Sequence, residues 1–148
     1  MHILAVQKTN ETTTASRLML AILKRRHMFF KKKPKYKAPL VTDATFHELI
    51  DTDQGIMIDF YADWCGPCKV LGPIVDELAQ ENEGRVHIVK VDTESNPQLS
   101  QLFKIKSIPT IAFLKNKKLI EVRNGLIPKP NLQEMIDDLV AFQWDEEE

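Results

Sequence analysis

Cysteine is scarce in this sequence: its 148 residues contain only Cys65 and Cys68, and two residues separate them. A small secreted protein held together by disulfides usually has several cysteine pairs that join distant parts of the chain. Two cysteines this close together join no distant loops. The sequence therefore argues against a secreted disulfide scaffold.

Histidine is also sparse, with four residues scattered singly at positions 2, 27, 47 and 87. A cysteine pair at this spacing can supply half of a structural zinc site, but four-coordinate zinc needs two further ligands, usually from a second cysteine or histidine pair. The sequence contains no such second pair. We therefore predict no metal site and interpret each histidine as a surface or boundary residue.

Long hydrophobic runs are missing from the first forty residues, where the longest is the six-residue run Leu18–Leu23. Six residues are too few for a transmembrane helix and fewer than a usual signal-peptide core. We expect no membrane span and no export, and hence a cytoplasmic protein.

Charge divides the chain near residue 40. Residues 1–40 contain ten Lys or Arg against one acid, a net charge of +9, whereas residues 41–148 contain ten against twenty, a net charge of −10. This division predicts a basic arm over residues 1–37, one compact domain over residues 38–143 and an acidic tail over residues 144–148. We expect disorder over roughly residues 1–36.

The arm has two interpretations. Basic and apolar residues alternate over residues 17–30, which is typical of an organellar targeting peptide. Alternatively, Met28 is the true start, because a compact domain with a short lead follows it. The first interpretation would place the protein in an organelle.

Strand and helix patterns alternate along the rest of the chain. The apolar run Gly55–Tyr61 contains a single acid and indicates a central strand, while apolar residues after Cys68 recur at helical spacing until Gly84. The patterns predict strands at residues 38–41, 55–61, 86–91, 110–114 and 118–122, and helices at residues 43–50, 65–83, 96–103 and 130–142. Thr42 or Asp43 is the expected cap of the first helix.

The sequence Trp-Cys-Gly-Pro-Cys-Lys occupies residues 64–69, where the predicted central strand meets the following helix, and Ile-Pro-Thr occupies residues 108–110. Over about residues 41–140, the chain resembles the thioredoxin family through these motifs. The resemblance implies an α/β domain with the thioredoxin fold: a central mixed sheet of four to five strands flanked by about four helices. It also implies a monomeric, general reductant of protein disulfides.

Disulfide exchange requires a thiolate, and a free cysteine with a pKa of about 8.5 is mostly protonated at neutral pH. Cys65 lies at the start of a helix, where unpaired N–H groups stabilise negative charge, so we predict that Cys65 is the attacking nucleophile. Cys68 lies about one helical turn further on, close to Cys65 and more enclosed. We predict that Cys68 resolves the mixed disulfide.

Asp59 is the single acid in the predicted central strand. An unpaired buried carboxylate is unfavourable, and it takes up a proton or is satisfied by partners. One interpretation is a satisfied structural carboxylate at a strand end. The thioredoxin resemblance implies instead a buried acid with a raised pKa that accepts the proton of Cys68, with Lys90 as a nearby charge partner.

The same resemblance implies a substrate-binding surface around the reactive sulfur and a cis peptide bond before Pro109. Its residues are Trp64, Gly66, Pro67, Ile108, Pro109 and Gly125. For Trp64, simple packing is the alternative, and we expect Asp63 and Lys69 to be solvated. The chain departs from the family pattern at Ser107, Lys117 and Pro128, which stand at positions that often hold Gly, Gly and Ser.

Three classes of function fit these motifs. The first is a dithiol reductant without a bound cofactor, whose Cys65–Cys68 disulfide is reduced by thioredoxin reductase, an NADPH-dependent flavoenzyme. The second is an oxidase or isomerase, although the Gly-Pro pair between the cysteines resembles that of reducing members. The third is a non-enzymatic subunit or chaperone. Disulfide-containing proteins are the expected substrates, and we expect no nucleic acid partner.

Overall fold

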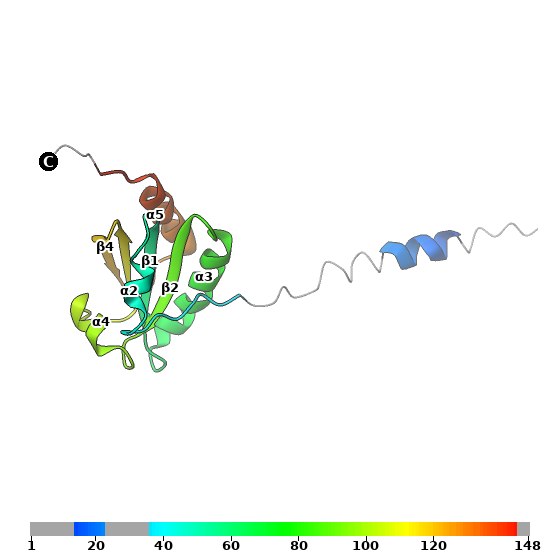
Figure 1. Cartoon of the computed structure of the whole chain (residues 1–148). Helices are drawn as coiled ribbons and strands as arrows, with labels where there is room; N and C mark the ends of the chain where they lie inside the picture. The colour runs from blue at the N-terminus through cyan, green and yellow to red at the C-terminus, as the bar shows by residue number, and fades with distance from the viewer. Residues whose placement is uncertain (1–13, 23–35, 145–148) are drawn as a thin grey trace, which may run out of the picture. The chain divides into compact units, whose positions relative to one another are not determined.

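The computed structural model of this chain describes residues 14–22 and 36–144 (Figure 1). Residues 14–22 form a helix, and the remaining elements form the domain. The elements of the domain are α2 (Phe46–Leu49), β1 (Gly55–Tyr61), α3 (Gly66–Glu81), β2 (Val86–Asp92), α4 (Pro97–Leu102), β3 (Thr110–Lys115), β4 (Lys118–Asn124) and α5 (Lys129–Ala141). Their order matches the predicted alternation of strands and helices.

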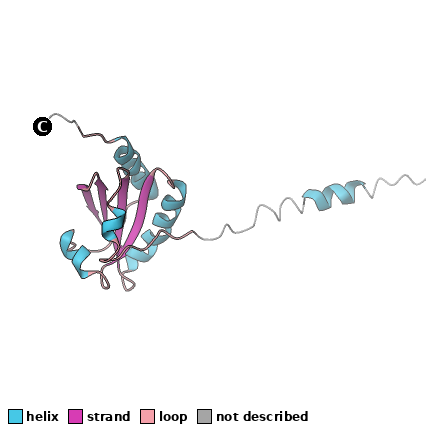
Figure 2. Cartoon of the chain, in the orientation of Figure 1, coloured by secondary structure: helices cyan, strands magenta, loops and turns pink. Residues whose placement is uncertain are grey.

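One mixed sheet lies at the centre of the domain, with the strand order β2-β1-β3-β4 (Figure 2). β1 pairs with β2 in parallel and with β3 antiparallel, and β3 pairs antiparallel with β4. The predicted strand at residues 38–41 is reduced to a single parallel bridge between Leu40 and Lys90 at the outer edge of β2. The predicted thioredoxin fold with a mixed sheet of four to five strands is confirmed.

Two hydrophobic clusters cover the two faces of the sheet. One contains side chains of α3 and α5, among them Leu71 and Ile136, and the other contains Leu99 of α4 with Phe46 of α2 packed against it. In Figure 1, α2 lies in front of the strands and α5 behind them. The sheet is therefore covered on both sides, which explains the continuous apolar run of β1.

Successive side chains along β1 point to opposite faces of the sheet. Met57 packs in the cluster of α3 and α5, whereas Ile58 and Phe60 pack in the opposite cluster. Asp59 is two residues after Met57 and therefore faces α3 and α5. The same period applies to β2, where Ile88 belongs to the first cluster and Lys90 follows it by two residues.

The first predicted helix is shorter than expected, and its predicted caps are wrong. α2 begins after Thr45, which is its N-cap, and not after Thr42 or Asp43. The Asp43 carboxylate instead accepts hydrogen bonds from the backbone N–H groups of Gln98 (3.1 Å) and Leu99 (2.8 Å), in the first turn of α4. Asp43 thus caps a helix that lies more than fifty residues later in the chain.

Two departures from the family pattern fall where the backbone turns. Lys117 and Asn116 form the β3–β4 turn, both with positive φ angles of 63° and 50°, which is the conformation that a two-residue hairpin turn requires. Pro128 is the N-cap of α5 and forms no side-chain hydrogen bond there. The helix nonetheless begins at Lys129, one residue before its predicted start.

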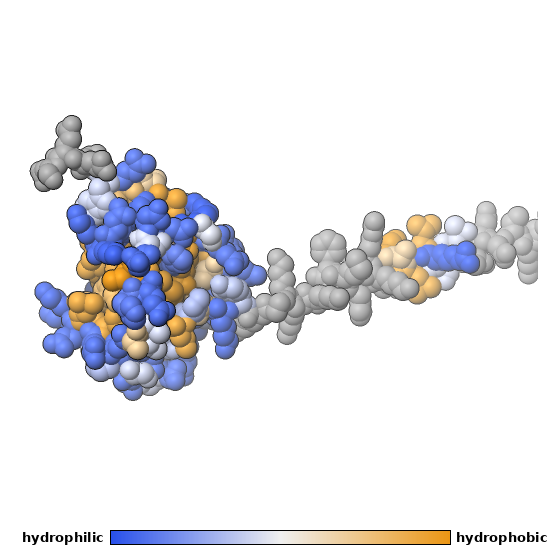
Figure 3. Space-filling model, in the orientation of Figure 1, coloured by the Kyte–Doolittle hydropathy of each residue, from blue (hydrophilic) through white to orange (hydrophobic). Residues whose placement is uncertain are grey.

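The basic arm is described only in part. Residues 14–22 form a helix, although disorder was predicted there, and the other predicted disorder before residue 36 lies outside the described residues. The helix exposes apolar side chains, visible as orange atoms in Figure 3: Leu18, Met19, Leu20 and Ile22. Of the predicted acidic tail, only Trp144 is described. None of the described helices has the length and apolar character needed to span a bilayer.

Candidate functional site

The two cysteines lie at the start of α3, shortly after the end of β1. Cys65 is the N-cap of α3 with extended backbone angles (φ −80°, ψ 113°), and Pro67 occupies the first helical turn. Proline is suited to this position because its missing N–H would have no partner within the helix. Cys65 and Cys68 form a disulfide, with their Cα atoms 5.3 Å apart. The motif therefore places both sulfur atoms at the N-terminus of one helix.

The sulfur of Cys65 occupies an electrostatically favourable position. Its Sγ accepts a hydrogen bond from the backbone N–H of Cys68, with 3.2 Å between the atoms. A donor that points at Sγ and the positive end of the α3 dipole both stabilise negative charge on this atom. The geometry thus favours a thiolate on Cys65.

Burial does not distinguish the two cysteines. Cys65 is 3% exposed and Cys68 is 5% exposed in the disulfide form, so the predicted greater enclosure of Cys68 is wrong for this form. The difference between them lies in their positions in the helix.

Asp59 is buried beneath this helix without a partner. The residue is 1% exposed, and neither carboxylate oxygen has a hydrogen-bond partner in the part of the chain that the structure describes. Loss of hydration raises the pKa of Asp59 from 3.8 to about 7; the positive charge of Lys90 opposes this shift and the negative charge of Asp76 adds to it. No described protein group therefore satisfies this carboxylate, as the structural alternative would require.

Lys90 lies beside Asp59 but binds elsewhere. The two residues are in register on the parallel strands β1 and β2. The Lys90 Nζ atom donates to Asp76 Oδ1 at 2.6 Å and to the Gly72 carbonyl oxygen at 3.1 Å, both on α3. Lys90 thus acts on Asp59 through its charge and not through a hydrogen bond.

Sequence reasoning missed Asp76. The residue is 8% exposed, on the side of α3 that packs against the sheet. The sequence alone gave no clear signal, because the exposed acid Glu77 follows Asp76 directly in the same helix. The packing of α3 on the sheet buries one of the two acids and leaves the other exposed.

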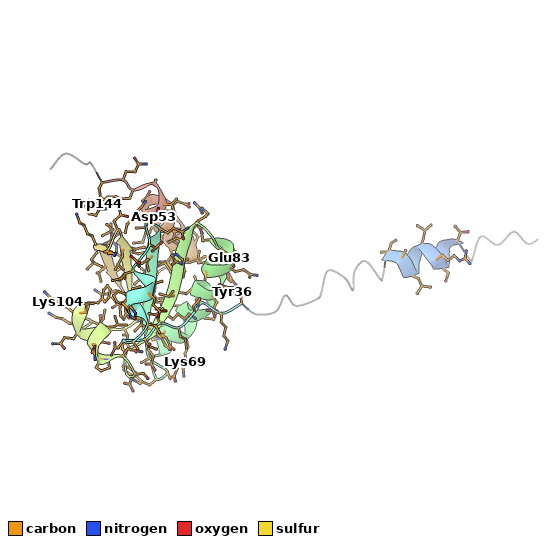
Figure 4. The ribbon with its side chains drawn as sticks, viewed as in Figure 1. Tyr36, Asp53, Lys69, Glu83, Lys104 and Trp144 are labelled. Carbon is orange, nitrogen blue, oxygen red and sulfur yellow. A yellow bond between two sulfur atoms is a disulfide. The ribbon has the colours of Figure 1, made fainter. Side chains whose placement is uncertain are left out.

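Trp64 precedes the first cysteine and projects into solvent. Its side chain is largely exposed, at 69%, so packing does not account for it. The indole Nε1–H donates to the Glu94 carboxylate at 2.8 Å, which holds the ring beside the disulfide. Sequence reasoning missed Glu94, which lies in the loop after β2 and carries no local signal. Asp63 and Lys69 are exposed as predicted, and Figure 4 shows Lys69 at the end of the domain where α3 begins.

The loop before β3 completes this end of the domain. The Ile108–Pro109 bond is cis, as predicted, and Pro109 is buried. The backbone N–H of Gly125 donates to the Pro109 carbonyl oxygen at 2.8 Å, and Gly125 has a φ of +90°, which favours glycine. Thr110 Oγ1 also donates to the Ser107 carbonyl oxygen at 2.6 Å. Gly125 is therefore placed next to the cis-proline loop, while Gly66 and Pro67 are exposed.

The described residues hold no group of three or more histidine, cysteine or acidic side chains that could bind a metal ion. The polar groups described above include one unpaired carboxylate, one buried ion pair and one exposed indole. Two sulfur atoms at a helix N-terminus and a nearby proton acceptor can perform thiol–disulfide exchange.

Comparisons with known proteins agree with this chemistry. The profile of the family described as Thioredoxin matches residues 37–138. Thioredoxin 1 of a Nostoc species is 42% identical over 101 residues, which are 68% of this chain and 94% of that protein. Thioredoxin of a Synechocystis species is 38% identical over 100 residues, 67% and 94% of the two chains. The crystal structure of Malassezia sympodialis thioredoxin superposes with a TM-score of 0.66 at 30% identity, covering 74% of this chain and 96% of that one.

Proposed function

This chain belongs to the thioredoxin family and is a protein disulfide oxidoreductase, and we propose that its Cys65 attacks substrate disulfides and its Cys68 resolves the mixed disulfide. One observation carries this assignment: Cys65 Sγ lies at the N-cap of α3 and accepts the Cys68 N–H. Cys68 Sγ occupies no such position, since Cys68 lies inside the helix. The helix therefore favours the anion at the first cysteine.

The reaction moves two electrons to the substrate in two exchanges. The Cys65 thiolate attacks one sulfur of a protein disulfide, so a mixed disulfide forms and the other substrate sulfur leaves as a thiolate that takes up a proton from solvent. Cys68 then loses its proton to Asp59, and its thiolate attacks Cys65 Sγ. The second substrate sulfur leaves and is protonated. The substrate is reduced, and the Cys65–Cys68 disulfide is restored.

Asp59 is suited to accept the Cys68 proton. Its pKa of about 7 makes the carboxylate available in part of the molecules at neutral pH, while a carboxyl of ordinary acidity would be too weak a base. Its position on the α3 side of β1 supports this role, because Cys68 is a buried residue of α3. Lys90 contributes its positive charge at the next strand.

An extended substrate segment is proposed to lie along the cis-proline loop. Ile108, Pro109 and Gly125 form this loop and its support, with Trp64, Gly66 and Pro67 as the exposed residues around Cys65. Backbone hydrogen bonds of the kind that add a strand to a sheet edge need no particular substrate side chain. Recognition on this surface would therefore tolerate many sequences.

Reduction of the disulfide by an NADPH-dependent flavoenzyme would complete the cycle. In an assay with NADPH, thioredoxin reductase and a protein disulfide substrate, we expect catalytic NADPH oxidation that depends on this protein. The Cys65→Ser variant is the control for direct reduction by the flavoenzyme. No turnover with reductases from several sources would contradict the general reductant function, and a strongly oxidising potential of the purified protein would favour an oxidase instead.

We propose that the redox domain folds and functions without the basic arm. We also propose that the protein is cytoplasmic. Deletion of residues 1–27 should leave the melting temperature and the reductase-coupled rate nearly unchanged, because among the described residues those that form the two hydrophobic clusters begin at Tyr36. Thermal unfolding and the coupled assay measure the two quantities. A loss of several degrees in the melting temperature would show that the arm docks on the domain. Fusions of the full-length and the shortened chain to a fluorescent protein test the localisation. Organellar fluorescence of the full-length fusion, and not of the shortened one, would identify the arm as a targeting peptide.

A further inference from the structure

Lys90 has a second acid, Asp59, on the neighbouring strand, to which it does not bind. Asp59 and Lys90 are in register on adjacent parallel strands, and both side chains face α3. Adjacent strands lie only about 4.8 Å apart, well within the reach of a lysine side chain. The carboxylate of Asp59 nevertheless has no partner, and the Lys90 ammonium is bound to α3.

Asp76 is held in place to receive this ammonium. Its Oδ1 atom accepts the backbone N–H of Ala38 at 2.9 Å and the Lys90 ammonium at 2.6 Å. The Asp76 and Lys90 side chains are only 11% and 14% exposed, so water competes little with their contact. One turn earlier on α3, the Gly72 carbonyl oxygen accepts from the same ammonium at 3.1 Å. Two acceptors of one helix thus hold Lys90.

We propose that Asp76 is a positioning residue for the exchange reaction, because it holds the Lys90 ammonium on α3 and leaves Asp59 without a counter-ion. A carboxylate that formed a direct ion pair with Lys90 would stay ionised and would be a weak base. A carboxylate that lacks the pair can take up a proton near neutral pH. Asp76 therefore acts through Lys90 on the group that is proposed to accept the Cys68 proton.

Few other charged groups act on Asp59. Lys90 faces it from β2 and Asp76 from α3, Tyr61 lies two residues along the same face of β1, and the cysteine pair lies at the start of α3. The residue in register on β3 is Ile111, and the buried residues of α5 are Leu132, Ile136 and Leu139. Among the groups that face Asp59 in the described domain, Lys90 is thus the one cation.

The Asp76→Asn variant tests this placement directly. The pKa of Asp59, followed by NMR of its side-chain carboxyl carbon in the oxidised protein, should fall by about one unit or more, because Lys90 is released to pair with Asp59. Asp76→Glu keeps a carboxylate for Lys90, so the pKa of Asp59 in this variant should stay close to that of the wild-type protein. Glu77→Gln removes one negative charge from the exposed side of the same helix and should leave the Asp59 titration unchanged.

Loss of the Asp76 charge alone would also lower the pKa of Asp59, so the part that depends on Lys90 must be separated. In a Lys90→Met background, Asp76→Asn should shift the Asp59 titration much less than it does with Lys90 present. An equal shift in both backgrounds, or no shift with Lys90 present, would overturn the proposal.

A measurement on the unmodified protein guards against a variant that fails to fold. Above neutral pH, the Lys90 Nζ should show a hydrogen-bond scalar coupling to the carboxyl carbon of Asp76 and none to that of Asp59. A coupling to Asp59 would overturn the proposal.

The inference rests on the proposed role of Asp59 in proton transfer. The effect of Asp76 on the titration of Asp59, however, can be measured whether or not Asp59 has that role. If Asp76→Asn moves the Asp59 titration and the pH dependence of the single-turnover exchange rate together, both are supported. If the titration moves and the rate profile stays, the placement of Lys90 is supported and the proton-acceptor role of Asp59 is overturned.

Discussion

Replacement of Cys68 with serine should turn this protein into a trap for its substrates. Cys65 in this variant still attacks, because the helix N-terminus and the N–H of residue 68 that stabilise its thiolate are backbone features. The mixed disulfide then persists, because no thiolate remains at position 68 to expel the substrate. We expect abundant covalent complexes and a coupled turnover reduced to background.

The Cys65→Ser variant is the matched control for the trap. It should capture no substrate, because Cys68 lies within the helix and lacks the N-cap position of Cys65. Its turnover should also fall to background. Non-reducing electrophoresis and mass spectrometry of the captured complexes compare the two variants. Equal trapping by both variants would refute the division of labour. The two cysteines, which are almost equally buried, would then be equally reactive.

Asp59→Asn should stabilise the oxidised protein while it slows exchange. The pKa of Asp59 is about 7 in the fold and 3.8 ordinarily, and each unit corresponds to about 1.4 kcal/mol, so ionisation destabilises the folded protein by at most about 4 kcal/mol near neutral pH. The asparagine amide is itself buried without partners, which offsets part of the gain. We expect a net increase of about 1–3 kcal/mol in the free energy of unfolding.

The pH dependence of this gain follows from the raised pKa. Below pH 3.8 the carboxyl is protonated in both the folded and the unfolded chain, so it carries no penalty and Asp59→Asn should gain little. Between this pH and about 7 the unfolded chain loses the proton and the folded one keeps it, so the stability of the wild-type protein falls. The advantage of the variant should therefore grow with pH and level off above neutrality.

The rate of the resolving step should move in the opposite direction. Loss of a general base lowers rates by about 10²-fold or more, although water can replace the carboxylate in part. Denaturant titrations at acidic and neutral pH and single-turnover kinetics measure the two effects. Asp63→Asn removes an exposed acid next to the site and should change neither. Lower stability with an unchanged rate in Asp59→Asn would exclude Asp59 as the proton acceptor.

Local patterns of the sequence predicted the order of strands and helices and the position of the reactive pair, and the family resemblance supplied the thioredoxin fold. The period of two along β1 and the period of the helix after Cys68 are set by neighbouring residues, and so is the position of Cys65 at a helix start. The single acid in an apolar strand drew attention to Asp59, and its burial, now observed, was implied by the family resemblance. The cis bond before Pro109 and its place near the site came from the family resemblance.

The partners of the polar groups required the tertiary structure. Asp76 binds Lys90 across 14 residues, Trp64 binds Glu94 across 30 and Asp43 caps α4 across more than fifty, and no periodicity links the members of these pairs. Packing of α3 on the sheet brings Asp76 to the lysine of β2, and that contact leaves Asp59 unpaired. The sequence by itself therefore determined which two residues form the redox pair and which elements carry them. The distribution of charge around the reacting atoms was decided by the fold, because hydrogen bonds between distant segments depend on how those segments pack.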